Sequence, residues 1–325
     1  YIESRHIKVA RFGDNMRNVA VTEGDKIEAQ IQLGWSVDGY GIGDLVTEIN
    51  AVSEQSLSEL ISEDEERYEW PEGEAARESV KEQARIELGL KRFLSSGGYT
   101  AFTTTFEDLH GMKQLPGLAV QRLMAEGYGF GGEGDWKTAA LVRMMKMMAG
   151  GKETSFMEDY TYHFEPGNEM ILGSHMLEVC PSIAEHKPRI EVHPLSMGAK
   201  DDPARLVFDG IAGPAVNVSL IDLGGRFRLV INKVEAVKVP HDMPNLPVAR
   251  VLWKPQPSLR TSAEAWILAG GAHHTCLSYQ LTAEQMLDWA EMSGIEAVLI
   301  NRDTTILNLR NELKWSEAAY RLRKF

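Results

Sequence analysis

The fold class is decided by residues 79–106, which read SVKEQARIELGLKRFLSSGGYTAFTTTF. Residues 79–82, Ser-Val-Lys-Glu, have the pattern of a capping box, and the apolar residues after them recur at helical spacing. The glycine pair at 97–98 ends the predicted helix. Residues 99–106 are rich in β-branched and aromatic side chains, which predicts a strand. A helix that leads directly into a strand is typical of an α/β fold.

The same alternation extends to both sides of this segment. Residues 7–12 resemble a short strand, and Pro116 lies at the expected first turn of a helix that stops near Gly127. A further helix is predicted at residues 136–148. These elements predict a parallel, Rossmann-like α/β domain over residues 1–154.

The pattern changes in the second half, residues 155–325. Short strand candidates crowd together at residues 205–209, 215–223 and 226–237. The glycine pair at 224–225 predicts a hairpin turn between two of them. Peripheral helices are expected after a capping box at Thr282 and at residues 308–320, with a strand at 295–300 between them. We therefore expect an antiparallel β-barrel domain with peripheral helices.

Composition excludes several classes of protein. The 325 residues are 43% hydrophobic and 25% charged, ordinary values for a globular protein. The 47 acidic and 34 basic residues give a net charge of -13, which argues against a nucleic-acid partner. Apolar runs are all shorter than the roughly 18 residues of a membrane helix, so no membrane partner is expected. Two cysteines are too few for a disulfide framework, which favours a cytoplasmic location.

Four segments could carry chemistry. Glu133 stands among glycines just before a predicted helix, and Glu158 follows Ser-Phe-Met. His175 follows Gly-Ser, and His274 ends the run Ala-Gly-Gly-Ala-His-His. Two carboxylates and two imidazoles suit a borderline divalent ion such as Mn²⁺, with Co²⁺, Mg²⁺ or Zn²⁺ as alternatives.

Each of these residues also has a structural interpretation. Glu133 could cap the following helix, where a carboxylate is favoured, and His273 and His274 could be an ordinary pair at a strand end. The four residues are far apart and form no compact ligand motif. Residues 127–132 fit G-x-G-x-x-G, but Glu133 and Asp135 follow immediately and would repel a pyrophosphate.

Longer segments resemble the L-arabinose isomerase family. They run in the family's order and cover nearly the whole chain. The segments are 11–17 (RFGDNMR), 103–111 (TTTFEDLHG), 113–122 (KQLPGLAVQR), 132–138 (GEGDWKT), 156–164 (FMEDYTYHF), 173–182 (GSHMLEVCPS) and 265–275 (AWILAGGAHHT).

The resemblance implies a set of site residues. It implies that the Mn²⁺ ligands are Glu133, Glu158, His175 and His274. It implies that the two glutamates are also the acid/base pair, and that Phe106 lines the sugar pocket. His273 is the adjacent choice of ligand and ranks below His274. Co²⁺ or Mg²⁺ could replace Mn²⁺.

The resemblance also implies the activity, an intramolecular oxidoreductase that interconverts L-arabinose and L-ribulose through a cis-enediol, with D-galactose and D-tagatose as a second pair. It implies a homo-oligomer, a hexamer in full-length family members and a tetramer or another assembly here. The family's chains carry a further N-terminal α/β domain, which we expect to be missing from this chain. The alternatives are isomerisation of another sugar, such as L-fucose, and a non-catalytic metal-binding remnant.

Overall fold

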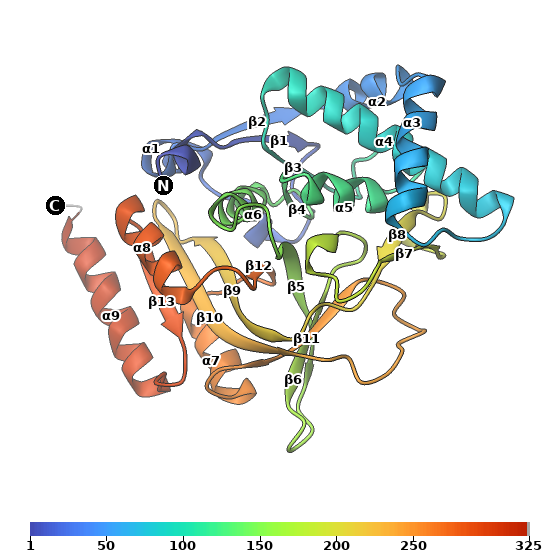
Figure 1. Cartoon of the computed structure of the whole chain (residues 1–325). Helices are drawn as coiled ribbons and strands as arrows, with labels where there is room; N and C mark the ends of the chain where they lie inside the picture. The colour runs from blue at the N-terminus through green and yellow to red at the C-terminus, as the bar shows by residue number, and fades with distance from the viewer. Residues whose placement is uncertain (324–325) are drawn as a thin grey trace.

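Two β-sheets follow one another along the chain and form the frame of the molecule (Figure 1). A computed structural model describes residues 1–323. The first sheet is parallel and has the strand order β2-β1-β3-β4. Its strands are β1 (Lys8–Phe12), β2 (Ser36–Tyr40), β3 (Ala101–Thr104) and β4 (Gly129–Gly131). The parallel α/β arrangement predicted for the first half of the chain is thereby confirmed.

Helices connect and cover the strands of the first sheet. They are α1 (Lys26–Leu33), α2 (Ile42–Asn50), α3 (Glu54–Arg67), α4 (Glu74–Gly97), α5 (Gly117–Ala125) and α6 (Trp136–Met148). Helix α4 ends where expected, because Gly98 adopts a left-handed conformation with a φ of 67°. It begins earlier than the capping-box pattern predicted, and Ser79 lies inside it. The Ser79 hydroxyl donates instead to the carbonyl of Asp202, a tertiary contact.

The second sheet has the strand order β11-β6-β5-β12-β9-β10-β13. Its strands are β5 (Thr154–His163), β6 (Met170–Ser174), β9 (Gly213–Asp222), β10 (Phe227–Val237), β11 (Arg250–Pro255), β12 (His274–Ser278) and β13 (Glu296–Ile300). A small separate ribbon pairs β7 (Arg189–Val192) with β8 (Ala204–Val207). The predicted hairpin is confirmed, since β9 and β10 pair along their whole length on either side of the glycine turn.

The expected purely antiparallel barrel needs correction. Strand β13 pairs with β10 in parallel, so the sheet is mixed. The parallel pairing follows from the chain path. Helix α8 (Ala283–Ser293) lies between β12 and β13, and a connection that contains a helix is long enough for the chain to cross the sheet and enter β13 in the parallel direction. Strand β11 pairs with β6 and also with the later part of β10. The coarser expectation, a parallel sheet followed by a largely antiparallel one, holds.

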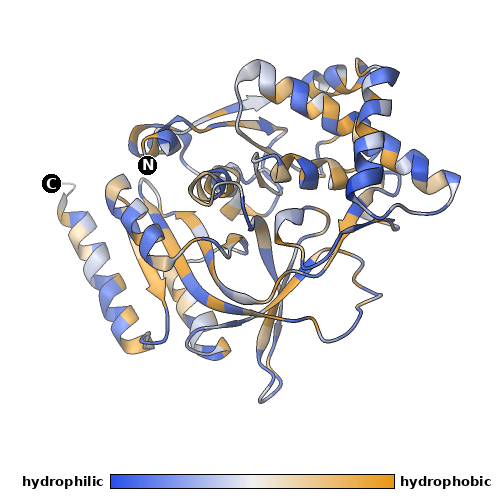
Figure 2. Cartoon of the chain, viewed as in Figure 1, coloured by the Kyte–Doolittle hydropathy of each residue, from blue (hydrophilic) through white to orange (hydrophobic). Residues whose placement is uncertain are grey.

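The two predicted peripheral helices, Ala283–Ser293 and Ile306–Arg323, are present, and a third helix that was not predicted accompanies them. Helices α7 (Leu259–Ala269) and α9 (Ile306–Arg323) pack against each other, and α8 packs on β10 and β13. The capping box of α8 is formed as predicted, with Thr282 and Gln285 bonded to each other's backbone. Within residues 1–323 no helix is long and apolar enough to cross a membrane. In Figure 2 the acidic helix α3 is largely hydrophilic, whereas apolar residues mark the strands beneath the helices.

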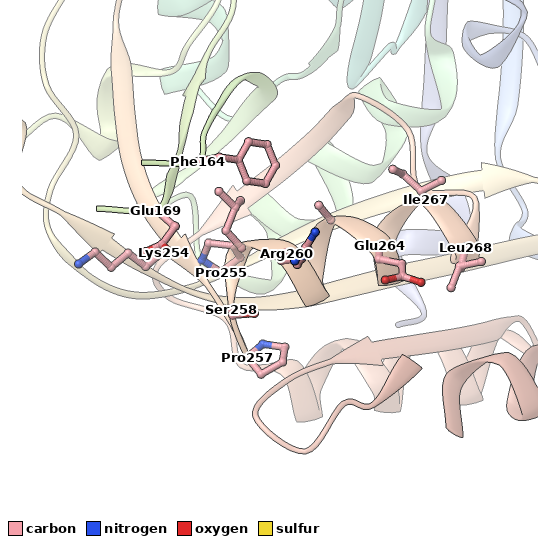
Figure 3. A pocket seen from close by; sticks show the side chains of 12 residues that line it. Phe164, Glu169, Lys254, Pro255, Pro257, Ser258, Arg260, Glu264, Ile267 and Leu268 are labelled. Atoms are coloured by element: carbon pink, nitrogen blue, oxygen red, sulfur yellow. The ribbon is translucent and has the colours of Figure 1, made fainter. Parts of the chain in front are cut away.

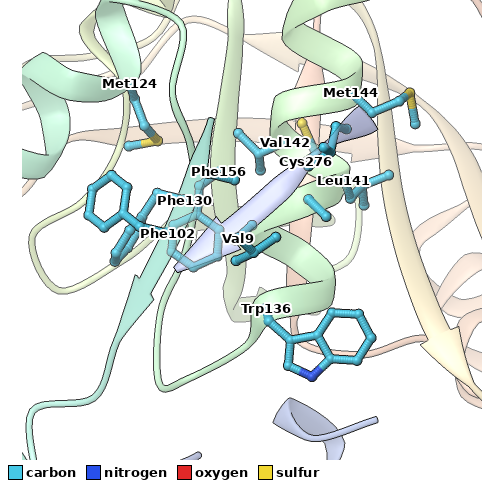
Figure 4. Close-up of a cluster of buried hydrophobic side chains, with 14 of the residues drawn as sticks. Val9, Phe102, Met124, Phe130, Trp136, Leu141, Val142, Met144, Phe156 and Cys276 are labelled. Atoms are coloured by element: carbon cyan, nitrogen blue, oxygen red, sulfur yellow. The ribbon is translucent and has the colours of Figure 1, made fainter. Parts of the chain in front are cut away.

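Helix α6 joins the two sheets. It contacts β1, β3 and β4 of the first sheet and β5, β9 and β12 of the second. Its apolar side chains merge with those of both sheets into one core, which Figure 4 shows around Trp136, Leu141 and Val142. Phe130 and Phe156, from β4 and β5, meet edge to face at 5.6 Å within this core. Helix α6 therefore lies between the two sheets, and the candidate residues lie near its N-terminus.

Candidate metal centre

Glu133 lies on the tight turn between β4 and α6. Its φ of 59° is in the left-handed region, which is uncommon for a residue other than glycine. Two backbone hydrogen bonds hold the turn in place: Met16 N–H donates to the Glu133 carbonyl at 2.9 Å, and Gly134 N–H donates to the Thr104 carbonyl at 3.0 Å. Strained backbone that is fixed by its surroundings is characteristic of functional sites.

Glu158 and His274 come from neighbouring antiparallel strands. They are directly opposite each other in the register of β5 and β12. Just beyond Glu158 the pairing of β5 with β6 shifts between Glu158 and Thr161. A bulge at this place bends the strand and re-aims the side chains beside it.

The closest group of candidate ligands is formed by Glu133, His273 and His274. Glu133 Oε2 lies 3.5 Å from His273 Nε2 and 3.8 Å from His274 Nε2. One ligand atom from each residue lies within 4.8 Å of the others. Neither Glu158 nor His175 belongs to a group of three this tight in the described part of the chain. His273 therefore belongs to the same group as His274, although the sequence motif ranked His273 lower as a ligand.

His175 lies next to this group. Its ring is 5.6 Å from that of His274, and Phe156 contacts both rings at 4.8 and 5.1 Å. Burial disfavours a charge on His175, yet the nearby carboxylates, first Glu178 and then Glu158 and Glu133, outweigh it and raise the His175 pKa. Glu158 and Glu133 therefore both raise the pKa of one imidazole, that of His175.

Each of the two buried imidazoles has a carboxylate on its Nδ1. His274 Nδ1 lies 3.2 Å from Asp135 Oδ2, and His175 Nδ1 lies 2.6 Å from Glu178 Oε2. A carboxylate on Nδ1 fixes the tautomer that leaves Nε2 with a free lone pair. His274 Nε2 is fully buried and has no hydrogen-bond partner. A buried, unpaired nitrogen facing a carboxylate fits a divalent cation, which would supply the missing partner.

Sequence reasoning missed the roles of Asp135 and Glu178. Glu178 follows His175 by three residues, a spacing that could have indicated it. Asp135 is the N-cap of α6, and its side chain accepts from Thr138 N–H. The capping role did not indicate that the other carboxylate oxygen of Asp135 faces His274, which lies on β12.

Electrostatics favour the ionised form of two carboxylates here, those of Asp135 and Glu133. Burial alone would raise the pKa of Asp135, but Lys137, His274 and the Thr138 amide outweigh it and hold the pKa well below its usual range. The pKa of Glu133 is also lowered, because His273 and the other imidazoles more than offset its burial. Burial lowers the pKa of His274, which favours the neutral ring that a metal requires.

Phe106 lines a small cavity beside the candidate ligands. The cavity is about 40 Å³, and Glu133, His175 and Met197 share its wall with Phe106. Pockets for small molecules are typically about 300–1,000 Å³. The cavity is therefore smaller than the usual site for a small molecule.

A larger groove lies elsewhere. It has a volume of about 1000 Å³ and runs along α7 (Figure 3). Phe164, Lys254, Arg260 and Ile267 are among its lining residues, and none of the candidate ligands is. The larger groove is therefore separate from the candidate metal centre.

Comparison with known proteins gives matches over most of the chain. Residues 8–151 match the model of the L-arabinose isomerase central domain, and residues 153–296 match that of the L-arabinose isomerase C-terminal domain.

Similar relatives include L-arabinose isomerase 1 of Bacillus licheniformis, with 99% identity over 325 residues, covering 100% of this chain and 66% of the relative. The L-arabinose isomerase of Geobacillus kaustophilus is 73% identical over 325 residues, and that of Bacillus subtilis is 72% identical over 326 residues. In both cases 99% of this chain and 66% of the relative are covered. The chain thus spans just under two thirds of the length of these relatives.

Proposed function

The chain belongs to the L-arabinose isomerase family, and on that basis we propose that it interconverts L-arabinose and L-ribulose in a metal-dependent reaction. The observation that carries the proposal is the buried Nε2 of His274, which lacks a partner and faces Glu133. A centre of carboxylates and imidazoles on these elements supports an aldose–ketose isomerase better than a nucleotide-binding protein. D-Galactose and D-tagatose are the second proposed substrate pair.

The proposed metal ligands are Glu133, Glu158, His175 and His274. Mn²⁺ suits this mixture of oxygen and nitrogen donors, with Co²⁺ or Mg²⁺ as alternatives. His273, 3.5 Å from Glu133, then serves as a hydrogen-bond partner of that carboxylate at the rim of the centre. When bound, the ion would supply a Lewis acid for the sugar's O1 and O2.

The proton transfers fall to the two glutamates. Aldose–ketose interconversion moves a hydrogen between C1 and C2 and a proton between their oxygens. One carboxylate takes the carbon-bound proton, giving a cis-enediol, while the other acid protonates oxygen, and the roles reverse on the way back. The lowered pKa of Glu133 keeps it in the form that accepts a proton at neutral pH.

Binding and exclusion of water fall to the neighbouring side chains. Phe106 is the proposed apolar wall of the sugar pocket, across the small cavity from His175 and Glu133. Movement of Met197, on the same wall, would enlarge the cavity for the sugar.

The larger organisation is proposed on the same basis. We place the domain boundary at 154/155, so that residues 1–154 form a Rossmann-like domain and residues 155–325 form a second domain built on the mixed sheet. The junction of the two family matches between residues 151 and 153 supports this boundary. We further propose a cytoplasmic homo-oligomer.

The test is a sugar assay on this chain after removal of metal with a chelator. Restoring Mn²⁺ should restore formation of L-ribulose from L-arabinose, and D-galactose and L-fucose complete the substrate panel. Glu133→Gln and Glu158→Gln should each abolish turnover, while Glu66→Gln, an exposed glutamate on α3, should leave it unchanged. Mn²⁺ binding without any turnover would instead indicate a metal-binding remnant, and turnover of L-fucose alone would indicate a different isomerase.

A further inference from the structure

Lys137, in the first turn of α6, carries a buried ammonium group. Only 2% of its side chain is exposed. Nζ donates to the backbone carbonyls of Val21 at 2.8 Å and Glu23 at 2.5 Å, and it lies 3.3 Å from Asp135 Oδ1. A buried charge is unfavourable unless partners surround it, so these three oxygens determine where the ammonium lies.

Asp135 is the link between Lys137 and the candidate metal centre. Its Oδ1 accepts from Thr138 N–H at 3.0 Å in addition to the contact with Lys137. Its Oδ2 accepts from the Thr138 hydroxyl at 2.8 Å and lies 3.2 Å from His274 Nδ1. Each carboxylate oxygen of Asp135 thus has two polar contacts, and together these contacts fix the orientation of the carboxylate. The contacts run from Lys137 through Asp135 to His274.

The carbonyls that hold Lys137 belong to the segment of residues 13–25. The Glu23 carboxylate anchors this segment, because it accepts from Arg11 at 2.7 Å and from the Trp136 indole at 3.1 Å. The same segment supplies Met16 N–H to the strained turn at Glu133. One segment therefore touches both sides of the centre: the Glu133 turn directly, and His274 through Lys137.

We propose that Lys137 is a positioning residue for the metal centre, which fastens Asp135, and through it the Nε2 of His274, to the segment of residues 13–25. Lys137 touches neither metal nor substrate. It sets the orientation of a ligand from the opposite domain, so that metal affinity depends on the folding of residues 13–25 over α6. The inference rests on the proposed function only in taking His274 as a ligand.

The same helix provides a matched control. Lys146 is as deeply buried as Lys137, and its Nζ donates to the Thr154 carbonyl at 2.7 Å and contacts Cys180 Sγ at 3.3 Å. These contacts include no carboxylate and do not lead to His274. Lys137→Met and Lys146→Met remove the same charge from the same helix, but only the first one breaks the path to the metal centre.

The experiment measures Mn²⁺ binding by calorimetry on chelator-treated protein, together with the absorption spectrum of the Co²⁺-loaded form. Lys137→Met should weaken Mn²⁺ binding by about tenfold, the lower end of the effect of losing a ligand's own outer partner, because Lys137 acts through Asp135, and it should change the Co²⁺ spectrum. Lys146→Met should leave both within a factor of about three. Equal losses in the two variants, or wild-type binding by Lys137→Met, would overturn the proposal.

A second variant keeps the test decisive if Lys137→Met lacks a cooperative thermal transition. Glu23→Gln weakens the anchor of the segment without touching the buried lysine, and it should weaken Mn²⁺ binding in the same direction. Unchanged binding by a folded Glu23→Gln protein would then overturn the proposal. A wild-type chain that binds no Mn²⁺ contradicts the metal centre itself, whereas Mn²⁺ binding without turnover contradicts only the proposed reaction.

Discussion

Glu158 and His274 face each other across β5 and β12, although the sequence separates them widely. Residues directly opposite on antiparallel strands have their Cβ atoms about 4.5–5.5 Å apart, close enough for two side chains to share one ligand. A slip of one residue in this register would turn one of the two side chains to the other face of the sheet. The candidate centre therefore depends on the register of β5 and β12.

The first prediction concerns this pair. If both side chains bind one cation, the effects of Glu158→Gln and His274→Asn on Mn²⁺ affinity should not add. Each single variant should weaken binding at least about tenfold, and the double variant should show a coupling of roughly 0.5–3 kcal/mol. Calorimetric titration of the three variants measures it. Ser278→Ala, at the other end of β12, is the control, and strictly additive losses would count against a shared ion.

The second prediction concerns Gly132, which lies against His175. A Cβ at this position would lie 2.9 Å from His175 Cε1 and 3.0 Å from Nε2. Gly132→Ala should therefore displace the imidazole and weaken Mn²⁺ binding by about tenfold or more. In the control Gly39→Ala the added methyl meets no atom within 4 Å, and binding should not change. Equal affinities of the two variants would refute the steric argument.

The third prediction concerns pH. Burial raises the pKa of Asp159 from 3.8 to about 6, even though Tyr162 donates a hydrogen bond to its carboxylate. The native state thus holds this proton more tightly than the unfolded state. The free energy of unfolding should fall as pH rises from about 4 to about 6, and the loss should persist above that range.

Asp159→Asn removes this titration. At pH 7.5 the variant should be more stable than the wild type by up to about 3 kcal/mol, while near pH 4 the two should be similar. Urea unfolding of metal-free protein at several pH values measures the difference, with the exposed Asp242→Asn as control. A stability difference that does not vary with pH would contradict the assignment.

The fourth prediction concerns a buried ion triad formed by side chains of α3, α4 and α5. Arg122 pairs with Asp64 and, at 2.7 Å, with Glu87, and all three side chains are at most 3% exposed. Arg122→Met leaves two buried carboxylates without a cation, which should cost about 3–5 kcal/mol of unfolding free energy. Lys91→Met breaks a surface pair with Glu126 and should cost no more than about 1 kcal/mol. Denaturant unfolding compares the two, and similar costs would contradict the prediction.

Local structure could be predicted from the sequence where neighbouring residues decide it. The strand at residues 8–12, helix α6 and the β9–β10 hairpin were all indicated by periodicity or turn residues. The capping box at Thr282 formed as its pattern required. The pattern at Ser79 did not act as a cap, because helix α4 extends further and the hydroxyl is used by Asp202. A short motif thus fails where a distant partner competes for the same group.

The candidate site divides in the same way. The sequence by itself determined which residue types stand in which segments, and the family motifs singled out Glu133, Glu158, His175 and His274. Only the tertiary structure decided that His273 joins Glu133, that Asp135 and Glu178 hold the two imidazoles, and that β13 adds a parallel strand. The physical reason is range: caps and periodicity depend on residues a few positions apart, whereas strand register and side-chain orientation are set by packing between distant segments.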